Sequence, residues 1–275
     1  MGNSVVVGAD GSAASLMAVE TAALEARRRG ADLRVVYALN WPVRPVYAPL
    51  ETTVLHRLVA DAADRARSVA PEVTVSEAML PGDSVSVLEN ESRSAELLVL
   101  GTRGTGGLLG TLLGSTAASV TAHSRCPVMV VREGPADDAG PVLLCVDGSP
   151  AGERAVEFAF AEAELRGAEI DAVHVWLPDY APAGTGVESA ERLLAQALAG
   201  QAQRRPNVTV TREVLSGETR TVLIERSRTA RLVVAGTRGR GGFTGLLLGS
   251  VSQALLHHAH CSVVVAPGGT GARES

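Results

Sequence analysis

Two glycine-rich segments, 135 residues apart, carry the residue types that bind phosphate. One runs from Gly101 to Ser115 and the other from Gly236 to Ser250, and both read G-x-x-G, nine residues, then G-S. Gly101 and Gly104 allow positive φ and a close approach of the backbone. Each segment leads into a predicted helix, whose free N–H groups and dipole favour an anion. The pattern therefore predicts two phosphate-binding loops.

The absence of lysine narrows the chemistry of these loops. All 25 basic residues are arginine, so a Walker lysine and a Schiff-base lysine are both excluded. The dinucleotide pattern G-x-G-x-x-G is also not met, because Leu109 follows where the last glycine would be. Arg103 and Arg238 are the side-chain cations within the loops, and arginine suits bidentate contacts to phosphate. They could equally be ordinary surface charges.

A second repeated feature is an aspartate that follows the first apolar run of each half. Asp10-Gly-Ser12 corresponds to Asp147-Gly-Ser149 at an offset of 137. These aspartates could face a ligand, or they could cap the helix that follows. The glycine loops have a structural alternative too, because a tight strand-to-helix turn would be duplicated together with its domain.

Histidine and cysteine also repeat, at His123 and His258 and at Cys126 and Cys261. A Cys/His pair can act in nucleophilic catalysis. Both pairs, however, fall at the far end of the helix after the loop, which favours packing. The three cysteines lack metal-site spacing and are expected to be reduced thiols. We find no assembled catalytic set and expect no metal ligated by protein side chains alone.

Composition excludes several classes of function. A net charge of −5 argues against a nucleic-acid-binding protein, which needs a basic face. No apolar run approaches 18 residues, and no cationic segment precedes a long apolar stretch, so neither a membrane span nor a signal peptide is expected. We therefore expect a cytoplasmic protein with no membrane partner.

Apolar runs and helical periodicity alternate along both halves. In the first half we expect strands at 4–8, 33–39, 73–80, 97–100 and 128–132, helices at 13–29, 51–69, 84–95 and 115–124, and a proline-rich loop at 40–49. In the second half we expect strands at 142–146, 170–176, 208–215, 232–235 and 263–266, and helices at 151–166, 188–204, 218–228 and 250–258.

This alternation predicts an α/β fold with two tandem, doubly wound, parallel five-stranded sheets and helices on both faces. Between 101–131 and 236–266, 15 of 31 positions are identical, which supports two domains, at 1–134 and 141–268. Ligands of such sheets bind outside the carboxyl ends of the strands. The aspartate turn, the end of the second strand and the glycine loop all lie there, so they should converge on one crevice per half.

The loops and their setting resemble the ATP-binding branch of the universal stress protein family, in two tandem copies. The resemblance rests on G-x-x-G-(nine)-G-S, on the string from Gly239 to Ser252 and on the run from Val142 to Ser149. It implies a fold like that of the adenine nucleotide alpha hydrolases, and ATP as ligand with Mg²⁺ on its phosphates. In the first half it implies contacts at Gly8, Ala9, Asp10, Ser12, Ala38, Gly101, Thr102, Arg103, Gly104, Gly106, Gly107, Gly114, Ser115 and Thr116. In the second half it implies contacts at Cys145, Val146, Asp147, Ser149, Val175, Gly236, Thr237, Arg238, Gly239, Gly241, Gly242, Gly249, Ser250, Val251 and Ser252.

One position departs from the family pattern. Ala117 stands where the second half has Ser252, which removes a hydroxyl, and we therefore expect weaker phosphate contacts in the first site.

The resemblance implies a nucleotide-dependent regulatory switch in stress response or growth control. It also implies that the two halves pair through their last strands as an intrachain pseudo-dimer; a homodimer and an unidentified protein partner are further options. The alternatives are a slow ATPase or phosphotransferase that uses the same pocket, and a scaffold that binds no nucleotide.

Overall fold

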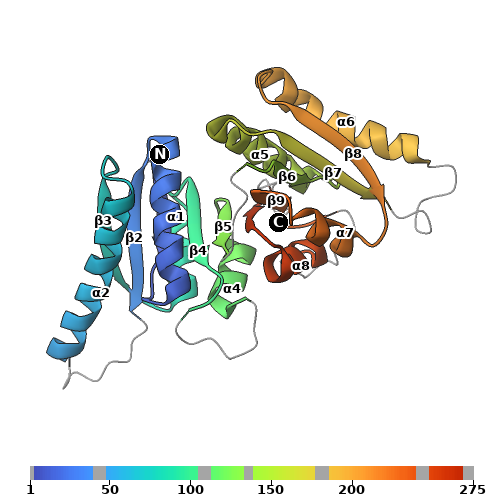
Figure 1. Ribbon diagram of the computed structural model, residues 1–275. Coiled ribbons are helices and arrows are strands. Elements are labelled where there is room, and N and C mark those ends of the chain that lie inside the picture. Colours follow the sequence, from blue (N-terminus) through green and yellow to red (C-terminus); the bar gives the residue numbers. More distant parts are fainter. Residues whose placement is uncertain are drawn as a thin grey trace, which may run out of the picture. The chain divides into compact units, whose positions relative to one another are not determined.

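The computed structural model describes residues 3–39, 48–104, 113–132, 139–176, 186–239 and 248–268. The chain divides into two compact units, Met1–Glu133 and Gly134–Ser275, and each is described here by itself. Both are α/β units with a parallel sheet and helices on both of its faces (Figure 1). The predicted fold class is therefore confirmed.

The sheet of the first unit has the order β3-β2-β1-β4-β5. Its strands are β1 (Ser4–Gly8), β2 (Asp32–Leu39), β3 (Val75–Pro81), β4 (Leu97–Gly101) and β5 (Val128–Val131). The pairs are parallel, with Val5 opposite both Leu33 and Leu97. β1 lies between β2 and β4, so chain connections leave it in opposite directions. This is the switch point at which ligands of doubly wound sheets bind.

The helices of the first unit are α1 (Ala13–Arg29), α2 (Ala48–Val69), α3 (Ser84–Glu91) and α4 (Ser115–His123). α1 packs against α2, and α3 packs against α4. The central strands are buried on both faces, with Val5, Val6 and Val7 at most 1% exposed. Continuous apolar runs of this kind are what a sheet covered on both faces requires.

The second unit repeats this plan with the order β10-β9-β6-β7-β8. Its strands are β6 (Val142–Cys145), β7 (Ile170–Trp176), β8 (Val210–Ser216), β9 (Leu232–Gly236) and β10 (Ser262–Ala266). Its helices are the short η1 (Pro150–Gly152), followed by α5 (Glu153–Arg166), α6 (Val187–Arg204), α7 (Thr219–Arg226) and α8 (Ser250–His258). Each strand and helix predicted for this half is present, with ends that shift by up to two residues apart from the opening of α5.

Most boundaries shift by one or two residues from the sequence-based expectation, and three differences have a clear structural cause. α3 ends at Glu91 rather than at residue 95, because Ser92 closes it and its hydroxyl accepts a hydrogen bond from the distant Arg125 N–H. The second unit opens α5 with a 3₁₀ turn that contains Pro150. The predicted loop 40–49 is shorter, since α2 already begins at Ala48; residues 40–47 lie outside the described residues. Proline is tolerated in a first helical turn, where its missing N–H costs nothing.

Candidate functional site

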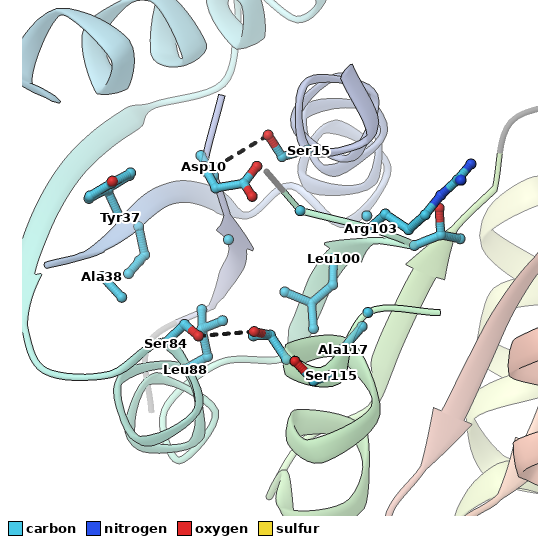
Figure 2. Close-up of a pocket in the computed structure, with 18 residues that line it drawn as sticks. Asp10, Ser15, Tyr37, Ala38, Ser84, Leu88, Leu100, Arg103, Ser115 and Ala117 are labelled. Atoms are coloured by element: carbon cyan, nitrogen blue, oxygen red, sulfur yellow. Dashed lines mark hydrogen bonds between the residues drawn. The ribbon is translucent and has the colours of Figure 1, made fainter. Parts of the chain in front are cut away.

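A cavity of about 400 Å³ lies in the first unit, at the carboxyl ends of β1, β2 and β4 and the amino ends of α3 and α4 (Figure 2). This volume is within the range of small-molecule sites. The cavity occupies the switch point described above. Its lining includes the following residues predicted for the site: Gly8, Ala9, Asp10, Ala38, Gly101, Thr102, Arg103, Gly104, Gly114, Ser115 and Thr116.

The Asp10 carboxylate is held against the glycine loop. Its Oδ1 accepts the Ser12 N–H at 3.0 Å, and a Cβ built on Gly104 would overlap its Oδ2. The helix is capped by Ser12 instead, whose Oγ accepts the Ser15 N–H at 3.2 Å. Capping therefore does not account for Asp10, which leaves its carboxylate at the cavity wall.

Ser12 does not line the cavity, but its side chain connects two segments that do. The Ser12 hydroxyl donates to the carbonyl oxygen of Arg103 at 3.2 Å, which links the aspartate turn to the glycine loop. The Arg103 side chain is exposed and, in Figure 2, extends away from Ser84 and Leu88. Gly106 and Gly107, also predicted for the site, lie outside the described residues.

The glycines of the loop have three separate roles. Gly101 gives α1 room, because a Cβ there would lie 2.6 Å from the carbonyl oxygen of Ala14. Gly104 gives room to Asp10. Gly114 is the N-cap of α4, with φ −72° and with its N–H bonded to the Thr102 carbonyl at 2.7 Å. Neither Gly101 nor Gly104 adopts the positive φ that glycine allows, so close approach alone selects glycine at both positions.

The floor of the cavity is apolar. A Cβ on Gly8 would lie 2.9 Å from Leu100 Cδ2 and 3.3 Å from Leu88 Cδ1, so those two side chains fill the space that glycine leaves. In the second unit Cys145 stands at the position of Gly8, and Ala235 at that of Leu100. In the first unit the larger side chain of the pair lies on β4, whereas in the second unit it lies on β6, the counterpart of β1.

The second unit reproduces the aspartate–glycine contact. Asp147 Oδ1 accepts the Ser149 N–H at 3.0 Å and its hydroxyl at 2.8 Å, and a Cβ on Gly239 would lie 2.7 Å from Asp147 Oδ2. Gly249 caps α8, and its N–H bonds to the Thr237 carbonyl at 2.8 Å. The same local geometry therefore recurs, although Gly241 and Gly242 lie outside the described residues.

Two further features of the second unit bear on its site. The Ser252 hydroxyl, 4% exposed, donates to the Gly236 carbonyl at 2.6 Å. Its proton is therefore engaged within the protein, which removes the reason for expecting an extra phosphate donor there. A cavity of about 240 Å³ reaches the predicted site residues Cys145, Val146, Asp147 and Ser149 from the side of α5 and α6.

The repeated histidines and cysteines lie away from these cavities. His123 Nδ1 is 2.8 Å from the Ser119 carbonyl oxygen and 3.3 Å from Glu89 Oε1, as a residue near the end of a helix can be. Cys126 is buried, and burial raises the pKa of its thiol to about 11. Cys145 also has a pKa raised by burial. Neither thiol is activated as a nucleophile at neutral pH.

The described residues contain neither a cluster that could hold a metal ion nor a helix that could cross a membrane. No group of three or more His, Cys, Asp or Glu side chains in those ranges is placed to hold a metal ion. Among the same residues, no helix has the length and apolar character needed to cross a membrane.

Several lining residues were missed by sequence reasoning: Ser15, Val36, Tyr37, Ser84, Leu88 and Leu100. Val36 and Tyr37 neighbour the predicted Ala38, and Leu100 precedes Gly101, so the ends of their strands were the available signal. Ser84 and Leu88 come from α3, whose packing against α4 is a tertiary contact that gives no local signal in the sequence.

Comparison with known proteins agrees with this architecture. The model of the universal stress protein family matches residues 1–132 and 139–267. Universal stress protein Rv2005c of Mycobacterium tuberculosis is 38% identical over 292 residues, covering 95% of this chain and 96% of that protein. Universal stress protein Rv2623 of the same species is 36% identical over 283 residues, with 95% of each chain covered.

A solved structure supports the fold independently. A universal stress protein from Archaeoglobus fulgidus superimposes with a TM-score of 0.76 at 20% identity, covering 98% of this chain and 97% of that one. The chain belongs to the universal stress protein family, and it contains two tandem copies of the family's domain.

Proposed function

We propose that the chain binds ATP in the cavity of the first unit and in the corresponding position of the second. One observation carries the proposal: an apolar floor of Leu88 and Leu100 adjoins a wall made of Asp10, Gly104 and the start of α4. A planar, weakly polar base suits such a floor, and phosphates suit the N–H groups of a helix start.

Different polar groups of the wall would contact different parts of the nucleotide. The N–H groups at the start of α4 have no intrahelical acceptors, and Ser115 adds an exposed hydroxyl beside them. Asp10 carries a negative charge at the junction of the β1 turn and the glycine loop, where it suits ribose hydroxyls or a phosphate-bound Mg²⁺. Its engagement with the Ser12 N–H fixes its orientation before any ligand arrives.

Occupancy would act as a regulatory switch rather than as a step of catalysis. A nucleotide held between the end of β4 and the start of α4 would stabilise the state of the protein that binds it best, as any ligand with differential affinity does. The surface that other molecules meet would then depend on nucleotide. This proposal places the chain in nucleotide-dependent control of stress response or growth.

Mass spectrometry of small molecules released from the purified full chain tests the proposal. We expect ATP in amounts comparable to the protein, and its loss in the variant Gly104→Ala, Gly239→Ala. A protein that is folded, that releases no adenine nucleotide and that takes up none on incubation with ATP and Mg²⁺ would contradict it.

A slow ATPase or phosphotransferase is the second candidate. The observation that favours it is a carboxylate fixed against the loop in both units, at Asp10 and Asp147. The rate of ATP turnover is measured in the wild type and in the variants Asp10→Ala and Asp147→Ala. A rate that depends on either aspartate supports the enzyme, whereas recovery of the bound nucleotide unchanged supports the switch.

A further inference from the structure

A hydroxyl pair at the wall of the first cavity distinguishes the two sites. Ser84 Oγ and Thr116 Oγ1 are 3.0 Å apart, and both residues line the cavity (Figure 2). Ser84 is the first residue of α3 and Thr116 the second of α4. Two helix starts, each with the positive end of its dipole, therefore meet at this pair.

The hydrogen bonding of the pair leaves a donor for a ligand. One hydroxyl gives its proton to the other, and the proton of the second hydroxyl then has no acceptor within the pair. Both side chains are half-buried, so a ligand in the cavity can reach them. A donor placed between two positive helix ends selects an anionic acceptor, and a phosphate oxygen is the acceptor that the proposed ligand carries.

The second unit lacks this pair. Thr219 stands at the position of Ser84 and keeps a hydroxyl, but Val251 stands at the position of Thr116 and has none. α7 and α8 pack together as α3 and α4 do, so the positions are structurally equivalent. The Ser252 hydroxyl cannot compensate as a donor, because its proton goes to the Gly236 carbonyl.

We propose that Ser84 and Thr116 form a phosphate-recognition pair that makes the first site the tighter of the two. This inference rests on the proposed nucleotide site and reverses the order of affinities expected from Ala117 and Ser252. Valine has nearly the volume of threonine, so Thr116→Val removes the hydroxyl and little else. Val251→Thr restores a hydroxyl opposite Thr219.

The experiment is calorimetric titration of the full chain with ATP, AMP and adenosine. The first site is isolated by Gly239→Ala and the second by Gly104→Ala. In the first background we expect Thr116→Val and Ser84→Ala each to weaken ATP about tenfold, with the double variant no worse than either alone. In the second background we expect Val251→Thr to tighten ATP several-fold. Adenosine should be unaffected in all cases.

The controls separate this inference from the proposed function. Urea midpoints that match between each variant and its background show that folding is intact. ATP binding that Thr116→Val leaves unchanged, or that falls equally for adenosine, would overturn the phosphate-recognition pair while leaving the nucleotide site in place. An absence of ATP binding in the wild type would overturn both.

Discussion

Asp10 and Gly104 are in direct contact across the site, and the contact recurs between Asp147 and Gly239. A Cβ at Gly104 would overlap Asp10 Oδ2, and one at Gly239 would lie 2.7 Å from Asp147 Oδ2. Neither glycine has positive φ, so alanine is compatible with the backbone at both. Glycine is therefore required at these positions to leave room for the aspartate carboxylate, and not to permit an unusual backbone conformation.

The first prediction concerns this contact. Gly104→Ala should push the Asp10 carboxylate out of place and lower the ATP affinity of the first site about tenfold or more. Gly200→Ala is the control, because nothing lies within 4 Å of a Cβ there and the residue is in the body of α6. That change should leave ATP binding intact and raise stability by about 0.5–1 kcal/mol. Equal ATP affinity in both variants would contradict the assignment.

The second prediction concerns Gly101, which we expect to matter for the packing of α1 rather than for ATP binding. Gly101→Ala would place a methyl group 2.6 Å from the Ala14 carbonyl oxygen and force α1 away from β4. We expect a loss of about 1–3 kcal/mol in the free energy of unfolding, measured by urea denaturation. An unchanged urea midpoint would show that α1 does not depend on this close approach.

The third prediction concerns a buried charge that repeats in both units. Glu25 is 1% exposed and pairs with Arg28 at 2.8 Å and with Arg29; Glu162 pairs with Arg166 in the same way. Glu25→Ala should cost up to about 3 kcal/mol, because the buried Arg29 loses one carboxylate partner and keeps Glu96 at 3.4 Å. Glu20→Ala is the control: its pair with Arg65 is exposed and worth less than about 1 kcal/mol. Similar losses in the two variants would contradict the importance of burial.

The fourth prediction is a pH dependence at the start of α7. Glu218 caps the helix, and hydrogen bonds from Arg220 and Thr221 lower the pKa of its carboxyl from 4.5 to about 2. The charged form is thus favoured in the folded protein, and its stabilisation is complete above pH 4.5 and lost as the pH falls toward 2. Because the side chain is half-exposed, the effect should stay below about 1 kcal/mol.

The measurement compares wild type with Glu218→Gln by thermal or urea unfolding across this pH range. The difference in stability should be present at pH 7 and should close as the pH approaches 2. A difference that stays constant with pH would show that the glutamate charge has no part in capping α7.

The sequence predicts the architecture well because the same order of apolar runs, helical patterns and glycines occurs in both halves. Short apolar runs such as Val5–Val7 fit strands buried on both faces, and Gly30 and Gly167 end their helices with φ of +60° and +59°. The end of α3 could not be predicted locally, since Ser92 is bonded to Arg125, 33 residues away.

The site residues could be predicted where they belong to one continuous sequence motif. The aspartate turn and the glycine loop lie next to strand ends, and Asp10, Gly101 and Gly104 line the cavity of the first unit, whereas Ser12 does not. The reasons for individual glycines were not predictable, because the partner of Gly101 is a carbonyl oxygen of α1. Neither was the pair of Ser84 and Thr116, which depends on how two helices meet.

The central claim is that the first cavity binds ATP through its phosphates. Calorimetric titration of the full chain with ATP and Mg²⁺ tests it most directly. We predict saturable binding that is markedly weaker for adenosine and is lowered about tenfold or more at the first site by Gly104→Ala. A folded protein that shows no saturable binding at millimolar ATP, or that binds adenosine as well as ATP, would contradict it.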